Sequence, residues 1–361
     1  MKVCHIITAL VFGGAERLLV NHTNLQSGDH EIHIIYLKGE PQIKPLLHPD
    51  IKVHYIPLNF KVLANVKKFL KELKPDIVHT HVGHADLIGL WASRKLSAKV
   101  FCTMHNVAYK GNWLDNIIYF LYRFSFNRIS KKAKITCVSE AIYDHVTKRL
   151  KVNPKRVIFI PNSINEVSIA ESNSDIRAKN GIPVDAFCLL TVSRLTPNKS
   201  IETLIEALPQ LKKEIENLYV VIIGSGEHLE FLKNLAVELD VQDVVNFKGG
   251  VLNPEYYYKV TDLFIHPSLF EGLPTVILEA FRGEAAVVAS DIPGNNDLVK
   301  EGETGLLFPK QDSSKLATQI IKLYKNATLC KKLAQNGHQL FLNKYSIKKY
   351  ASSIEKFYGE E

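Results

Sequence analysis

The chain has 361 residues and a formal net charge of +8 at pH 7, and 46% of its residues are hydrophobic while 23% are charged. This length exceeds one typical hydrophobic core and predicts two domains, and the composition is ordinary for a soluble globular protein. No apolar run is long enough to span a bilayer, which excludes an integral protein of transmembrane helices. The first apolar run, residues 3–12, leads into Gly13 and Gly14, and it is typical of a buried strand rather than of a secretory signal.

Charge is distributed unevenly along the chain. Residues 1–165 contain 24 Lys and Arg against 11 Asp and Glu, a net of +13, whereas the remaining 196 residues have a net of −5. A basic first half favours an anionic membrane surface or an anionic acceptor as partner, with charge that only maintains solubility as the alternative. Nucleic acid is not an expected partner, because no RNA- or DNA-binding motif accompanies the charge.

The five cysteines are an odd number, and four of them (Cys4, Cys102, Cys137 and Cys188) lie inside apolar, strand-like runs. Such cysteines are typically packed thiols and not disulfide partners. This pattern favours the reducing cytoplasm.

Strands and helices alternate through the first half. Residues 2–8 have the pattern of a buried strand, and the turn at Gly13 and Gly14 leads into a helix, which is how a doubly wound parallel sheet begins. The dinucleotide fingerprint G-x-G-x-x-G is absent, which disfavours a nicotinamide or flavin enzyme. Further strands are predicted at residues 32–36, 53–56, 77–80, 100–104, 135–138 and 157–160. The alternation predicts one α/β domain that ends near residue 160.

Four histidines end or follow these strands. His79, His81 and His84, together with His105, suggest a metal site, but no nearby cysteine or carboxylate set completes one, so we expect no metal. His105 comes directly after a predicted strand, at the carboxyl end where open α/β sheets bind ligands. A satisfied surface histidine is the alternative, and it suits His81 better than His105.

Two basic stretches could contact a membrane. Residues 61–74 place their apolar side chains on one face, and residues 110–134 combine many apolar and aromatic side chains with a basic cluster after them. Both stretches could equally pack on the sheet. We favour packing for residues 61–74, and for residues 110–134 both interpretations stay open.

The second half repeats the alternation. A domain boundary is predicted at Pro161-Asn162-Ser163, ahead of a polar stretch. Arg194 and Lys199 lie in the loop after the first strand of this half, and two cations ahead of a helix can hold a diphosphate. Gly224 and Gly249 form turns after the next two strands. The predicted strands are 187–192, 218–223, 244–247, 262–266, 286–290 and 306–308, and helices are expected at 201–214, 228–239 and 343–358.

Residues 266–291 carry two carboxylates, Glu271 and Glu279, eight residues apart. A turn with Gly272 and Pro274 precedes a helix that is expected to begin at about Thr275. Free backbone N–H groups at that end bind anions, so a carboxylate beside them suggests a ligand with an anionic end and many hydroxyls. A sugar nucleotide fits this description, and an ordinary strand–turn–helix with solvated glutamates is the alternative.

These motifs resemble the donor-binding signature of the family 4 glycosyltransferases, which are retaining enzymes of the GT-B superfamily. The two glutamates after His-Pro-Ser are the most specific match, and the resemblance covers nearly the whole chain. It implies an α/β fold of two Rossmann-like, doubly wound domains that face each other across a cleft. Residues 1–162 would be the acceptor-side domain, with a C-terminal helix from residues 343–361 packing back on it, and residues 163–342 would bind the nucleotide sugar.

The resemblance also implies roles for individual residues. Arg194 and Lys199 would bind the donor diphosphate, Glu271 the sugar hydroxyls and Glu279 the ribose, while His105 would contact the transferred sugar. The implied catalytic residues are His105, Arg194, Lys199 and Glu271, and the implied donor site adds Gly13, Gly14, Gly224, Gly249, Gly272, Leu273, Thr275 and Glu279. Ser193, Ser200 and Glu284 stand where the family has glycine, Ala286 where it has proline, and Asp297 where glutamate is common. We expect these departures to alter packing and not chemistry.

The implied reaction moves a hexose-type residue from a nucleoside diphosphate sugar to a glycan or lipid-linked acceptor with retention of configuration. A UDP-sugar is favoured as donor and GDP-mannose comes next, and no metal or other cofactor is expected. Surface polysaccharide biosynthesis in the cytoplasm, with the enzyme peripheral on the inner face of the membrane, is the expected setting. A sugar-nucleotide epimerase and a non-catalytic sugar-nucleotide-binding subunit are the alternatives.

Overall fold

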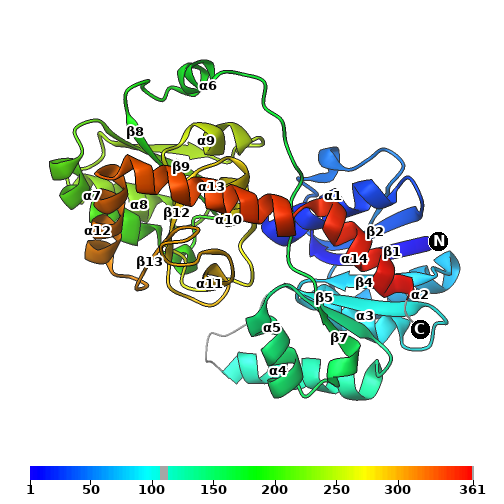
Figure 1. Cartoon of the computed structure of the whole chain (residues 1–361). Helices are drawn as coiled ribbons and strands as arrows, with labels where there is room; N and C mark the ends of the chain where they lie inside the picture. Colours follow the sequence, from blue (N-terminus) through cyan, green and yellow to red (C-terminus); the bar gives the residue numbers. More distant parts are fainter. Residues whose placement is uncertain (106–112, 360–361) are drawn as a thin grey trace. The chain divides into compact units, whose positions relative to one another are not determined.

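The computed structural model describes residues 1–105 and 113–359. The chain divides into two compact units, which are Met1–Asn165 with Ile347–Glu361 and Glu166–Ser346 (Figure 1). Each unit is built on one parallel sheet with helices around it, which confirms the predicted fold of two doubly wound α/β domains.

The first unit has a seven-stranded sheet in the order β3-β2-β1-β4-β5-β6-β7. The chain moves outward from β1 to β3 and then returns to the other side of β1, so the strand order reverses between β1 and β4. Ligands of open α/β sheets bind beyond the carboxyl ends of strands at such a reversal. The strands are β1 (Lys2–Ala9), β2 (Glu31–Lys38), β3 (Lys52–Tyr55), β4 (Ile77–His81), β5 (Lys99–Met104), β6 (Lys134–Cys137) and β7 (Val157–Phe159).

Two apolar layers enclose this sheet because side chains alternate along each strand. Val3 and Ile7 pack in the layer beneath α14, whereas Cys4 and Ile6 pack in the layer of Val66 on α2. The helices α14 and α1 run beside each other in Figure 1. The helices of the unit are α1 (Gly14–Gln26), α2 (Val62–Leu73), α3 (His84–Ser93), α4 (Trp113–Phe124), α5 (Glu140–Asp144) and α14 (Ile347–Gly359).

The second unit has a six-stranded sheet in the order β10-β9-β8-β11-β12-β13, and the order reverses between β8 and β11. Its strands are β8 (Phe187–Val192), β9 (Leu218–Ile223), β10 (Val245–Gly249), β11 (Leu263–His266), β12 (Ala286–Ser290) and β13 (Leu306–Phe308). Its helices are α6 (Asn173–Asn180), α7 (Ile201–Glu214), α8 (Leu229–Glu238), α9 (Glu255–Val260), α10 (Thr275–Arg282), α11 (Asn295–Leu298), α12 (Ser313–Tyr324) and α13 (Ala327–Lys344).

The C-terminal end differs from the single helix expected at residues 343–358. Helix α13 continues to Lys344, the helix breaks at Tyr345, and α14 begins at Ile347. Tyr345 is 8% exposed and Ile347 is 5% exposed, and the backbone N–H of Ile347 donates to the carbonyl of Ile164. Burial of these two side chains in different units ends one helix and starts the next.

The stretch at residues 110–134 is divided between core and surface. Phe126 is fully buried, and the Tyr122 hydroxyl donates to Asp86 Oδ2 at 3.0 Å, so these two side chains hold the segment to its unit. Other apolar side chains of α4 are exposed, namely Ile117, Ile118, Phe120, Leu121 and Phe124. Residues 110–112 lie outside the described part of the chain. Among the described residues, no helix is long and apolar enough to cross a membrane.

All five cysteines are free, and the four expected to be packed thiols are buried, which confirms that prediction.

Candidate active site

The loops that leave β8 and β11 meet at the carboxyl ends of these neighbouring strands in the second unit. The backbone N–H of Leu269 donates to the carbonyl of Asn198 at 2.9 Å, which ties the two loops together. Arg194 and Lys199 belong to the first loop and Glu271 to the second, so the strand reversal brings together motifs that are far apart in the sequence. This is the edge of the sheet where a nucleotide ligand is expected.

Gly224, directly after β9, and Gly249, the last residue of β10, extend the same edge. The N–H of Gly224 donates to the carbonyl of Gly249 at 2.7 Å, and the N–H of Leu195 donates to the carbonyl of Ser225 at 2.9 Å. Gly224 has a φ of +143°, and a Cβ there would lie 1.7 Å from the carbonyl oxygen of Ser193. Only glycine allows these loops to approach so closely, and the result is a continuous surface of backbone beside Arg194.

Lys199 and Glu271 form an ion pair at the centre of this edge. Lys199 Nζ lies 2.6 Å from Glu271 Oε1, and the two side chains are only 15% and 11% exposed. His266, the last residue of β11, lies with Nε2 3.0 Å from the same oxygen. Burial alone would raise the pKa of Glu271, but the charge of Lys199 and the hydrogen bond from His266 hold this pKa well below its usual range. Glu271 is therefore a fixed carboxylate.

Arg194 differs from Lys199 because its side chain is exposed and makes no hydrogen bond or ion pair with any other described residue. Lys199 in the same loop is already paired, whereas the N–H groups of the Arg194 guanidinium are available to bind a phosphate.

Helix α10 begins at Thr275, as the sequence predicted, directly after the Glu271 loop. Gly272, Leu273 and Thr275 are buried, and the N-cap residue, Pro274, makes no side-chain hydrogen bond to the first turn. The free N–H groups of such an end favour an anion. Glu279 lies one turn further along α10, and the buried Tyr258 of α9 lies beside it. Burial and then the charge of Glu279 raise the pKa of the Tyr258 hydroxyl.

Two supporting residues were missed by the sequence analysis. The sequence analysis includes His266 only in the His-Pro-Ser motif, although its place at the carboxyl end of a buried strand is a signal for a residue of the site. Gly294 has a φ of +90°, and a Cβ there would lie 2.8 Å from the carbonyl oxygen of Glu271 and 2.6 Å from that of Gly272. Gly294 therefore supports the Glu271 loop from behind, and the Pro-Gly-Asn turn was the available signal.

Three of the predicted site residues belong to the first unit. Gly13 is the N-cap of α1 and Gly14 its first residue, next to the strand reversal of that sheet. His105 follows β5 and is 6% exposed, and neither of its ring nitrogens has a hydrogen-bond partner among the described residues. Burial lowers the pKa of His105 to about 4, so the ring is neutral at pH 7.

The histidines considered as metal ligands fall into two groups. His84 is exposed at the start of α3, whereas His79 and His81 are buried and lie beside His5 of β1. One ligand atom from each of His5, His79 and His81 can be chosen so that all three lie within 4.8 Å of one another. Five of the six ring nitrogens already make hydrogen bonds, to Gln26, Tyr358, Thr103 and each other. These hydrogen bonds give the ring nitrogens partners within the protein, as is usual for polar side chains packed in a core.

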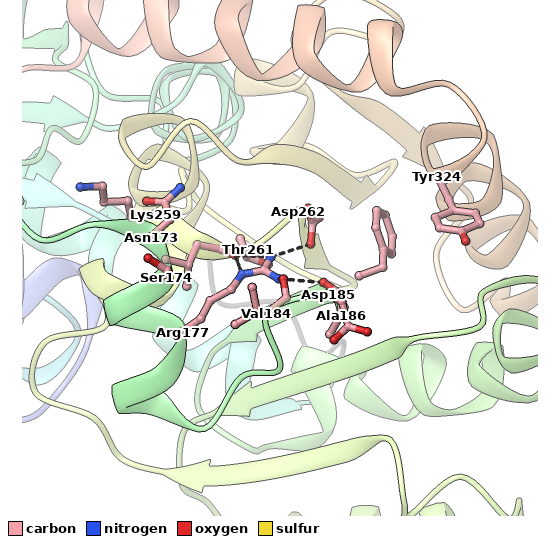
Figure 2. Close-up of a pocket in the computed structure, with 12 residues that line it drawn as sticks. Asn173, Ser174, Arg177, Val184, Asp185, Ala186, Lys259, Thr261, Asp262 and Tyr324 are labelled. Carbon is pink, nitrogen blue, oxygen red and sulfur yellow. Dashed lines mark hydrogen bonds and ion pairs between the residues drawn. The ribbon is translucent and has the colours of Figure 1, made fainter.

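A pocket of about 550 Å³ lies at the opposite edge of the second sheet, where β8 and β11 begin (Figure 2). Two cations line it: Arg177 of α6 donates to Asp262 Oδ2 at 3.0 Å and to the carbonyl of Val260 at 2.9 Å, and Lys259 Nζ donates to the carbonyl of Ile169 at 2.7 Å. Because both cations already donate to protein oxygens, neither described cation of the pocket is free for a phosphate, and Arg177 anchors α6 instead.

Family models match both units of the chain. The model described as "Glycosyltransferase Family 4" matches residues 12–167, and that described as "Glycosyl transferases group 1" matches residues 172–340. The chain belongs to the GT-B, family 4-like glycosyltransferases. The predicted family is thereby confirmed, and an enzyme that transfers a glycosyl group is its function at the coarsest level.

Individual relatives of this glycosyltransferase match it along nearly the full length of both chains. The UDP-Gal:alpha-D-GlcNAc-diphosphoundecaprenol alpha-1,3-galactosyltransferase of Escherichia coli is 24% identical, over 99% of this chain and 96% of its own. A Campylobacter jejuni alpha-1,4-N-acetyl-D-galactosaminyltransferase that acts on an undecaprenol-linked glycan is 28% identical, over 94% and 93%. The crystal structure of Anabaena Alr3699/HepE with UDP and glucose has the same fold, with a TM-score of 0.88, 19% identity and full coverage of both chains.

Proposed function

We propose that this glycosyltransferase moves a hexose-type residue from a nucleoside diphosphate sugar to a glycan or lipid-linked acceptor and retains the anomeric configuration. The single observation that carries the proposal is the Lys199–Glu271–His266 cluster at the strand reversal of the second unit. A UDP-sugar is the favoured donor and GDP-mannose the next. The E. coli and C. jejuni relatives support this choice, because their names specify UDP-Gal in one case and undecaprenol-linked acceptors in both.

The proposed chemistry is stabilisation of a departing diphosphate. Negative charge grows on the leaving phosphate as positive charge grows on the sugar, so fixed cations near the phosphate lower the barrier. The exposed guanidinium of Arg194 and the Nζ of Lys199 supply this charge, and the first turn of α10 adds backbone N–H groups. Because these groups provide the positive charge themselves, the proposed reaction uses no metal and no cofactor.

Two carboxylates have separate proposed roles. Glu271 stays ionised beside Lys199 and accepts hydrogen bonds from sugar hydroxyls, which fixes the orientation of the sugar. Glu279, one helical turn after Thr275 on α10, accepts hydrogen bonds from the ribose hydroxyls. His105 of the first unit is neutral and contacts the transferred sugar. The leaving phosphate takes the acceptor proton, so no carboxylate nucleophile is needed.

Binding and product analysis test this proposal. We expect UDP, and not GDP, to raise the melting temperature of the protein at millimolar concentration, since a ligand that binds only the folded state stabilises it. We also expect slow release of UDP from a UDP-sugar without acceptor. An epimerase would instead change the free sugar nucleotide, and a non-catalytic subunit would bind it without release. The proposal fails if neither UDP, GDP nor any of their sugars shifts the melting temperature.

We further propose that α4 touches an anionic membrane surface, which would place the enzyme in the cytoplasm, peripheral on the inner face of the membrane. Ile117, Phe120, Leu121 and Phe124 recur at helical spacing, and Phe120 is 63% exposed. Arg128, Lys131 and Lys132 are exposed directly after this helix. Exposed apolar side chains beside a basic cluster are the pattern of an interfacial helix.

Flotation with liposomes of anionic lipid at low salt measures this contact. We expect the wild-type protein to float with the liposomes and the Phe120→Ser variant to float less, because the most exposed apolar side chain of α4 is removed. Phe231→Ser is the matched control, since Phe231 is 49% exposed on α8 of the second unit. Equal flotation of both variants, or none by the wild type, would remove α4 from the proposal.

A further inference from the structure

A continuous chain of hydrogen bonds crosses the first unit from α14 to β4. Gln26 Nε2 lies 2.7 Å from Glu355 Oε1, and Gln26 Oε1 lies 3.2 Å from His5 Nε2. His5 Nδ1 in turn lies 3.0 Å from His81 Nε2. Gln26, His5 and His81 are each at most 3% exposed, whereas the Glu355 side chain is 36% exposed. This series of hydrogen bonds therefore connects the partly exposed carboxylate of Glu355 to the buried imidazole of His81.

The carboxylate at one end fixes every proton along this chain. An ionised carboxylate only accepts hydrogen bonds, so Gln26 must donate its Nε2 to Glu355, which turns its carbonyl oxygen toward His5. His5 must then donate from Nε2, and its Nδ1 becomes an acceptor. His81 must consequently donate from Nε2, which leaves Nδ1 as its unprotonated nitrogen. His30 Nε2, 3.0 Å from Glu355 Oε2, holds the other oxygen of the carboxylate in place.

Both imidazoles have to be neutral for this order to hold, because a protonated ring has no acceptor nitrogen. Burial lowers the pKa of His5 to about 4, and burial followed by the neighbouring histidines holds the pKa of His81 well below its usual range. At pH 7 each ring thus has one donor and one acceptor, and the geometry assigns which nitrogen is which.

His81 is the last residue of β4, at the strand reversal of the first sheet. Its Nδ1 makes no hydrogen bond with another described residue. The ring of His105 lies beside it, with 6.0 Å between ring centroids, and both nitrogens of that buried ring also lack a described partner. Buried polar atoms without partners are rare in folded proteins, so the two unpartnered nitrogens of His105, next to His81 at a sheet edge, point to a ligand.

We propose that Glu355, Gln26 and His5 are positioning residues that hold His81 in its Nε2–H form, so that His81 Nδ1 accepts a hydrogen bond from a hydroxyl of the sugar acceptor. The identity of the ligand as a hydroxyl-bearing acceptor rests on the proposed function. A fixed lone pair selects a hydroxyl donor and gives a carbonyl or ether oxygen no partner. A metal held by His5, His79 and His81 is the competing use of the same cluster, and it would need one unprotonated nitrogen of each ring as its ligand.

Proton positions are measurable by ¹⁵N NMR of the imidazoles, which separates protonated from unprotonated nitrogens without an activity assay. We expect His81 protonated at Nε2 and unprotonated at Nδ1 in the wild type. Glu355→Ala should release the Gln26 amide and populate the opposite form, while Glu355→Gln should keep the wild-type form because its carbonyl oxygen still accepts from Gln26. Ser352→Ala, on the exposed side of α14, is the matched control.

Transfer kinetics test the role of the chain. Glu355→Ala is expected to lower kcat/KM for the acceptor about tenfold, the effect of one hydrogen bond to substrate. Its rate of UDP release without acceptor should stay at the wild-type value, and Glu355→Gln should restore acceptor use. Unchanged acceptor use in a Glu355→Ala variant that still folds overturns the proposed role.

The spectra decide the proton order separately. A wild-type His81 protonated at Nδ1, or one equivalent of bound metal by elemental analysis, overturns the inference even if Glu355→Ala does not fold. If the wild type neither binds nor cleaves a nucleotide sugar, the proposed function fails, and the spectra still show whether the proton order was assigned correctly.

Discussion

Replacement of Lys199 by alanine is expected to lower turnover by about a hundredfold, the typical effect of removing one preorganised group that stabilises transition-state charge. The same change is expected to destabilise the folded protein by about 3 kcal/mol, because it leaves the buried carboxylate of Glu271 without its cation. His266 alone then compensates that carboxylate, at 3.0 Å. Steady-state kinetics with a UDP-sugar and urea unfolding at pH 7 measure the two effects.

A double variant separates chemistry from stability. Adding Glu271→Gln to Lys199→Ala removes the uncompensated charge, so the free energy of unfolding should recover while turnover stays low. Lys212→Ala is the matched control, since Lys212 lies 2.7 Å from Asp243 in an exposed pair of the same unit and such pairs contribute little. Recovery of turnover in the double variant would show that Lys199 acts only by stabilising the fold.

Acid is expected to destabilise this protein well above the pH at which most carboxylates titrate. Burial lowers the pKa of seven histidines in the first unit: to about 4 for His5, His105 and His145, well below the usual range for His22, His79 and His81, and in the same direction for His54. Between about pH 6.5 and pH 4 the unfolded chain therefore binds more protons than the folded one, and stability falls as the pH falls. Each proton contributes a slope of about 1.4 kcal/mol per pH unit.

Asp86 opposes this trend but does not reverse it. Burial raises the pKa of this carboxyl to about 7, so the folded state holds a proton that the unfolded state has lost, and its contribution to stability falls as the pH rises. The protonation of this one carboxyl is outweighed by that of the seven histidines. Urea unfolding between pH 7 and pH 5 should consequently show a steep loss of stability.

Variants of single histidines check this assignment. His22 is 1% exposed and neither ring nitrogen has a described partner, so His22→Leu removes a titrating group without breaking a hydrogen bond. We expect the free energy of unfolding of this variant to change less steeply with pH than that of the wild type, by the amount that about one proton contributes. His48→Asn, at a side chain that is 49% exposed, should leave the slope unchanged. An unaltered slope in His22→Leu would contradict the explanation.

Most strands were predictable because each is a short apolar run between turn residues, the usual form of a buried parallel strand. The bounds of β8, β9, β12 and β13 match the prediction, and so do those of α7. The α4 stretch was ambiguous for a physical reason, since an apolar helical face packs equally well on a sheet or on lipid. Only the structure separates the buried Phe126 from the exposed Phe120.

Departures from the family pattern keep the backbone geometry that glycine would give. Ser200 has a φ of +50° and Glu284 a φ of +59°, in the left-handed region that favours glycine. The Ser200 hydroxyl lies 2.9 Å from that of Thr203 inside the unit. The sequence identified these substitutions, and the structure shows that Ser200 and Glu284 each adopt a left-handed backbone conformation that is strained for a residue other than glycine.

The sequence by itself determined the family, the two parallel α/β domains and the residue types of the donor site, because local patterns and motif spacing carry that information. Only the tertiary structure decided which of these residues contact each other. Lys199 meets Glu271 across 72 residues of sequence, Gly294 supports the Glu271 loop, and Glu355 reaches His81 through Gln26 and His5. These contacts depend on which strands lie side by side, and that order is set by crossovers and packing of the whole sheet, which no local stretch of sequence encodes.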